Sequence, residues 1–105
     1  MVCMIRWVNQ LYISDNLMKK KDKVIAAISC RKATFNIYCI TFASQPRNLF
    51  DIIDANELLF PHYRNVDICI VGLAKGKENA IQLVQKMLEE IYYNTGEFDV
   101  RSYFT

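Results

Sequence analysis

The sequence predicts an α/β fold with a small sheet of three to four strands, parallel at its core, and two to three helices packed against it. Two observations lead to this prediction. Short apolar runs alternate along the chain with segments of helical spacing, most clearly where the run Ile68–Ala74 breaks and a long amphipathic segment follows. A strand, helix, strand order with right-handed crossovers makes core strands parallel. The second observation is that 105 residues, 52% of them hydrophobic, suit a single domain spanning residues 1–105.

The first expected strand covers Met4–Ser14. Its apolar side chains largely alternate with the other residues, as in a half-buried strand, although a helix is the alternative here; they are Ile5, Trp7, Leu11 and Ile13. Ser14-Asp15-Asn16 then supplies residues that favour a helix start. Apolar residues at helical spacing indicate a helix up to about Arg31.

The second expected strand covers Asn36–Ala43, which is rich in β-branched and aromatic residues on both faces. Such a composition is typical of a strand that is covered on two sides. A break follows at Ser44–Asn48, and Leu49–Phe60 then places its apolar residues near one helical face. We expect a helix there, with a short strand at Ile52 and Ile53 as the alternative.

The third strand is expected at Val66–Ala74, followed by a helix from about Lys77 to Asn94. On a helical wheel one broad arc of that helix is apolar, which predicts a buried face formed by Ala80, Ile81, Leu83, Val84, Met87, Leu88 and Ile91. Gly96 is placed to end the helix. The tail Phe98–Phe104 alternates like an edge strand.

Charge is unevenly distributed along the chain. Residues 1–50 carry eight Lys or Arg against two Asp or Glu, whereas residues 51–105 carry five against nine. Such polarity can pair two copies of the chain head to tail. A short chain with few strands also leaves sheet edges or an apolar face exposed, so we expect a homo-oligomer, in the first place a dimer, that hides this surface.

The composition favours a cytoplasmic protein without a cofactor. No apolar run is long enough to cross a bilayer, and the first residues lack the pattern of a secretory signal. The four cysteines form no C-x-x-C pair and no cluster with the single histidine, so no metal site is expected; they are Cys3, Cys30, Cys39 and Cys69. We expect them to be reduced and mostly buried.

The break after the third strand is the best candidate binding site. A helix that starts there presents free N–H groups and the positive end of its dipole, which suit a phosphate or carboxylate. The candidate ligand-binding residues are Lys75, Gly76, Lys77, Glu78 and Asn79, with His62 and Arg64 from the preceding loop. The segment departs in two ways from the phosphate-binding loop of nucleotide-binding proteins, in which a glycine and four residues precede Gly-Lys and a Ser or Thr. Three residues instead of four separate Gly72 from Gly76, and Glu78 replaces the Ser or Thr whose hydroxyl would hold magnesium.

Two other charged groups have ordinary explanations. Asp51, Asp54 and Glu57 recur every third residue and would form an acidic stripe on a helix, but such a stripe is usually a solvated face. The lysines at positions 19, 20, 21 and 23 are interrupted by Asp22 and have no interleaved aromatic residue, which argues against nucleic-acid binding. No catalytic set is recognisable, so the sequence favours a binding or assembly module over an enzyme.

Three segments carry a resemblance: Asn48–Leu59, Ile70–Gly76 and Gly96–Arg101. Through these segments the chain resembles a family of small uncharacterised bacterial proteins. The resemblance extends over most of the chain. The resemblance implies a bacterial cytoplasmic origin and assigns no role to any residue.

Overall fold

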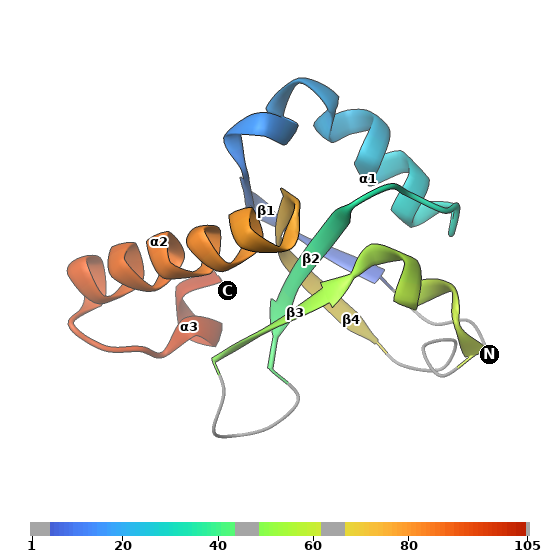
Figure 1. Ribbon diagram of the computed structural model, residues 1–105. Helices are drawn as coiled ribbons and strands as arrows, with labels where there is room; N and C mark the ends of the chain where they lie inside the picture. The colour runs from blue at the N-terminus through green and yellow to red at the C-terminus, as the bar shows by residue number, and fades with distance from the viewer. Residues whose placement is uncertain (1–4, 44–48, 62–66, 105) are drawn as a thin grey trace.

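The structure is a computed structural model that describes residues 5–43, 49–61 and 67–104. Over these ranges the chain forms four strands, two 3-10 helices and three α-helices (Figure 1). In chain order they are β1 (Ile5–Ile13), η1 (Asp15–Lys20), α1 (Lys21–Ser29), β2 (Ile37–Phe42), β3 (Phe50–Asp54), η2 (Ala55–Leu59), β4 (Ile68–Lys75), α2 (Lys77–Thr95) and α3 (Val100–Phe104). None of these helices combines the length and the apolar character that crossing a bilayer requires.

The four strands form one mixed sheet in the order β1-β4-β2-β3. β1 runs parallel to β4, while β2 runs antiparallel to both β4 and β3. The two inner strands are the ones whose sequences are apolar on both faces, as expected for strands with a layer on either side. The predicted α/β class and small sheet are therefore confirmed.

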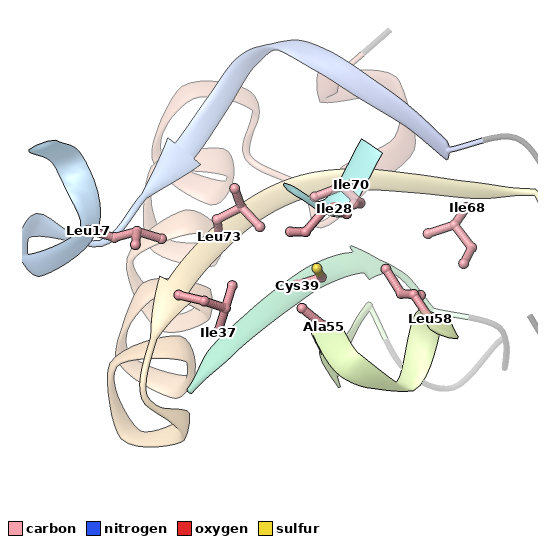
Figure 2. Packing of buried hydrophobic residues seen from close by; sticks show 9 residues of the cluster. All are labelled: Leu17, Ile28, Ile37, Cys39, Ala55, Leu58, Ile68, Ile70 and Leu73. Carbon is pink, nitrogen blue, oxygen red and sulfur yellow. The ribbon is translucent and has the colours of Figure 1, made fainter. Parts of the chain in front are cut away.

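Helical segments cover both faces of this sheet. On one face, side chains of β2 and β4 pack against η1, α1 and η2 (Figure 2), in a cluster of Leu17, Ile28, Ile37, Cys39, Ala55, Leu58, Ile68, Ile70 and Leu73. On the other face, α2 packs against the same two strands through Ile40, Val71, Ala74, Ala80, Leu83 and Met87. The second layer also contains Phe104 of α3.

The prediction that all core strands are parallel holds for β1 with β4 and is wrong for β2. β1 ends where Ser14 N–H donates to the Leu73 carbonyl at 3.0 Å, and β2 begins where Ile37 pairs with Lys75. The excursion through η1 and α1 thus leaves and re-enters the sheet at the same end. A strand that enters at that end must run in the opposite direction.

The outer strand β1 is irregular in its middle. Trp7 pairs with Ile70 and Tyr12 pairs with Gly72, so residues 8–11 of β1 lie opposite Val71 alone. The same residue of β4 is also extra with respect to β2, where Ile40 pairs with Gly72 and Thr41 with Ile70. Both pairings of β4 are therefore bulged at one level of the sheet.

The helix expected at Leu49–Phe60 is a strand followed by a 3-10 helix. β3 pairs with β2 from Phe42 opposite Phe50 to Tyr38 opposite Asp54, and this pairing satisfies backbone groups that a surface helix would bond internally. The alternative short strand at Ile52 and Ile53 is confirmed. The Asp54 side chain then accepts a hydrogen bond from the Asn56 N–H at 2.9 Å and starts η2.

The edge strand expected at Phe98–Phe104 is wrong, because the segment forms the short helix α3. Asp99 precedes this helix and accepts hydrogen bonds from the N–H of Ser102 at 3.4 Å and from its hydroxyl at 2.8 Å. Helical geometry also brings Val100 and Phe104 to the same side, toward the core. Capping and burial of these two residues outweigh the alternating pattern.

The amphipathic helix is confirmed with nearly the predicted bounds. Of its predicted buried face, Ala80, Leu83, Met87 and Ile91 are buried and Val84 and Leu88 are half-buried. Ile81 is the exception, because 44% of its surface is exposed.

Candidate functional site

The predicted binding residues that the structure describes lie in the turn between β4 and α2. Lys75 ends β4, Gly76 has a φ of 89°, and α2 begins at Lys77. That φ lies in the region that favours glycine, which explains why the chain can turn in a single residue. Gly76 N–H also donates to the Asn36 carbonyl at 2.8 Å, so the turn is tied to the loop that enters β2.

Amide side chains around this turn hold its backbone. The Asn79 and Asn16 side-chain amides both donate to the Lys75 carbonyl, at 2.9 and 3.3 Å. The Lys75 N–H donates to the Ser14 hydroxyl oxygen at 3.1 Å, and that hydroxyl donates to the Asn16 side-chain oxygen at 2.7 Å. Asn79, one of the predicted ligand residues, therefore has a structural role in addition to any other.

The electrostatics of the turn are mixed. Gly76, at the N-cap of α2, makes no side-chain cap hydrogen bond, and the first N–H groups of the helix lie at the positive end of its dipole. Glu78 lies in the same first turn and opposes the attraction of an anion. The structure thus brings Lys75–Asn79 together, while His62 and Arg64 lie outside the described residues; the anion site stays a prediction.

A cavity of about 270 Å³ lies beside this turn, between the end of β1, η1 and α2. Asn79 is the member of the predicted set that lines it. The other lining residues are Ile13, Ser14, Asp15, Asn16, Gln82, Leu83 and Lys86.

A larger and much more apolar depression lies at the opposite end of α2. We call it the aromatic groove; its volume is about 440 Å³, and it is lined by Leu49, Leu88, Glu89, Tyr92, Tyr93 and Phe98. Tyr93 is 89% exposed, Tyr92 53% and Phe98 48%. The Tyr92 and Phe98 rings stack at 25° with centroids 4.9 Å apart, so the wall of the groove is a preformed aromatic surface.

Sequence reasoning did not single out the aromatic groove. Tyr92 and Tyr93 fall outside the apolar arc of the helix, and Phe98 was expected in a strand. The available signal was the Tyr-Tyr pair at the end of an amphipathic helix, followed at once by Gly96 and Phe98. Large aromatic residues that continue beyond the buried face of a helix indicate an apolar surface outside the core.

The acidic stripe expected on a helix is not formed, because Asp51 and Asp54 lie on β3 and Glu57 lies on η2. Asp54 caps η2 as described above. Within the ranges 5–43, 49–61 and 67–104, no group of three His, Cys, Asp or Glu side chains is arranged to hold a metal ion. The predicted lysine cluster lies on η1 and α1, with all four lysines exposed as a solvated face.

The cysteines of the described residues are free thiols in three different environments. Cys39 is buried, Cys69 is half-buried and Cys30 is exposed, while Cys3 lies outside the described residues. Burial, with a smaller contribution from the Asp54 charge, raises the pKa of Cys39 to about 12. Burial also raises the pKa of Cys69, against the opposing charges of Arg6 and Arg101. Both thiols therefore stay protonated at neutral pH, which disfavours them as nucleophiles.

Comparison of the chain with known protein families, with curated proteins and with solved structures gave no significant match. No residue role therefore reaches this chain from a relative.

Proposed function

We propose that this protein is a cytoplasmic, non-catalytic binding or assembly module that self-associates, and that the aromatic groove is its contact surface. The observation that carries the proposal is the exposure of Tyr92, Tyr93 and Phe98 around one apolar depression. Contiguous apolar surface on a folded protein marks sites of association, and Tyr and Phe are enriched there. The free thiols of Cys30 and Cys39 agree with a reducing compartment.

The charge distribution supports a second copy as the occupant of the groove. Glu89 lines the groove, and Glu97 and Asp99 flank Phe98 in the sequence. The η1–α1 region of the same chain carries the basic excess. A copy of this chain therefore brings the charge that the rim of the groove attracts.

Sedimentation velocity over a concentration series tests this proposal. We expect the average mass of the wild-type protein to rise with concentration, and Tyr93→Ser to weaken association by about tenfold or more, as for a central interface aromatic. Ile81→Ser is the matched control, since it removes another exposed apolar residue of α2 outside the groove. A wild-type protein that stays monomeric at high micromolar concentration, or equal losses in both variants, would refute the proposal.

The anionic-ligand prediction remains the second candidate, favoured by the uncapped start of α2 next to the cavity at Asn79. The support for this candidate is weaker, because the Asn16 and Asn79 side-chain amides already donate hydrogen bonds to the Lys75 carbonyl. Glu78 also adds negative charge at the start of α2. Thermal shifts with phosphate and with small carboxylates separate the candidates. A response that Lys77→Ala abolishes and Lys23→Ala preserves would support the ligand site, whereas no response would count against it.

A further inference from the structure

The loop between α1 and β2 displays a phenylalanine to solvent. Phe35 is 85% exposed, although an apolar ring of that size normally gains by burial. Its neighbours on both sides are held in place. Thr34 N–H donates to the Asn56 side-chain oxygen at 2.8 Å, the Asn56 amide donates back to the Thr34 carbonyl at 2.8 Å, and the Asn36 carbonyl accepts from Gly76 N–H at 2.8 Å.

The backbone of this loop is further constrained at its two ends. Arg31 and Asn36 adopt φ values of 58° and 57°, in the left-handed region that non-glycine residues rarely occupy. The Arg31 guanidinium donates to the Leu58 carbonyl at 2.7 Å, which fixes the start of the loop on η2. The backbone that carries Phe35 is therefore held in place, and binding through this residue loses little loop entropy.

The loop between α1 and β2, which carries Phe35, lies on the other side of the molecule from the last turns of α2 (Figure 1), and those turns line the aromatic groove. The Asn36–Gly76 hydrogen bond places the Phe35 loop next to the residue that precedes α2, while Tyr92 and Tyr93 lie near its end. From Gly76 to Tyr92 the helix rises by about 24 Å at 1.5 Å per residue. Phe35 can therefore reach a groove of this kind only on another molecule.

The two ends of α2 also differ in charge. The Phe35 end has exposed Lys32 and Lys77 and the positive end of the helix dipole, partly offset by Glu78. The groove end has Glu89 in its lining and the negative end of the dipole. Groove-to-groove contact brings like charges together, whereas contact between unlike ends pairs opposite ones.

We propose that Phe35 of one copy inserts into the aromatic groove of the next, so that the protein associates head to tail. This inference rests on the proposed function, because it names the occupant of the same groove. An apolar side chain that enters a pocket elsewhere on an identical molecule makes a heterologous contact. Such a contact leaves one free Phe35 and one free groove on every pair, so association continues into chains or closes into a ring.

Two variants distinguish this arrangement from a symmetric dimer. Phe35→Ser keeps an intact groove, and Tyr93→Ser keeps an intact Phe35. We expect each variant alone to be monomeric, and an equimolar mixture to form a heterodimer of twice 12.3 kDa that grows no further. Native mass spectrometry and sedimentation velocity measure this, and Phe60→Ser, which removes another exposed phenylalanine, is the control that keeps wild-type association.

Each other outcome has a definite meaning, provided that circular dichroism shows all variants folded. If Phe35→Ser associates like the wild type while Tyr93→Ser does not, the groove contacts itself and the head-to-tail inference is refuted, although the proposed function stands. If both variants are monomeric and the mixture is too, the inference is also refuted. If the wild type never associates, the proposed function and the inference both fall.

Discussion

Cys39 has no exposed surface in the cluster between the sheet and α1 (Figure 2). Its thiol packs as a small apolar group, and a thiolate there would lose its hydration without gaining a cation. The same burial that raises its pKa to about 12 makes the position sensitive to alkaline conditions.

We predict that alkaline pH destabilises the protein partly through Cys39. Between its ordinary pKa of 9.0 and about 12 the unfolded chain has lost the thiol proton and the folded chain keeps it. The free energy of unfolding therefore falls as pH rises, with a limiting slope of about 1.4 kcal/mol per pH unit from this one group. Urea unfolding between pH 8 and pH 11 measures the slope, which should be shallower in Cys39→Ala than in the wild type. Equal slopes in the wild type and Cys39→Ala would contradict this assignment.

Single residues also show where prediction from sequence stops. The pattern around Phe35 carries no sign of its exposure, because the hydrogen bonds that display it come from Asn56 and Gly76, far along the chain. The turn at Lys75–Asn79 was predictable, since the break at glycine and the start of helical spacing are both local. The structural use of the Asn79 amide was not, because it depends on where the Lys75 carbonyl points.

At the scale of elements, α2 is the segment that connects the core to the proposed contact surface. Its last turn closes with the Gly96 N–H donating to the Tyr92 carbonyl at 2.7 Å, and Thr95 Oγ1 donating to the Ile91 carbonyl at 2.7 Å. Gly96 has a φ of 73°, so it ends the helix in the left-handed conformation. The position of Phe98 against Tyr92 follows from this turn.

We predict that Gly96→Ala lowers the free energy of unfolding by about 1 kcal/mol, the cost of a β-carbon at positive φ. The space around this position is empty within 4 Å, so the loss comes from the backbone alone. Gly96→Asn should lose less, since asparagine tolerates this conformation better. Chemical denaturation of the three proteins checks the order, and a Gly96→Ala protein as stable as the wild type would contradict it.

Elements whose signal is local were predicted closely, and those shaped by distant contacts were not. β2, β4 and α2 follow from runs of apolar residues and helical spacing within each segment. The helix predicted for the β3 segment is wrong because pairing with β2 decides its conformation. The strand predicted for the α3 segment is wrong because packing of Phe104 against residues far along the chain favours a helix. The direction of β2 depends on where the excursion through α1 returns, which no local pattern records.

For the whole molecule, the C-terminal helix closes the second layer of the core. Besides its neighbour Tyr103, the Phe104 ring contacts three rings from the sheet edge to face, with centroids 5.9 Å from Tyr12, 6.0 Å from Phe42 and 6.3 Å from Phe50. The Arg101 guanidinium lies 4.8 Å from the centre of the Phe42 ring. Residues from both ends of the described chain therefore share one aromatic cluster.

We predict that Phe104→Ala lowers the free energy of unfolding by about 2–3 kcal/mol, somewhat below the range for a fully buried phenylalanine because this ring is half-buried. Tyr93→Ser, which removes an exposed aromatic residue, should stay within about 0.5 kcal/mol of the wild type. Urea unfolding at a concentration that keeps the protein monomeric makes the comparison. A loss in Tyr93→Ser as large as in Phe104→Ala would show that Tyr93 belongs to the core.

The irregular middle of β1 has a consequence for how the molecule can be extended. Sheets lengthen into fibrils when an outer strand offers an unbroken row of amide and carbonyl groups as a template. Between Trp7 and Tyr12 the pairing of β1 with β4 shifts register, so the backbone of β1 is irregular there. Templated growth is therefore hindered along this border, whereas the proposed association through side chains is one that dilution reverses.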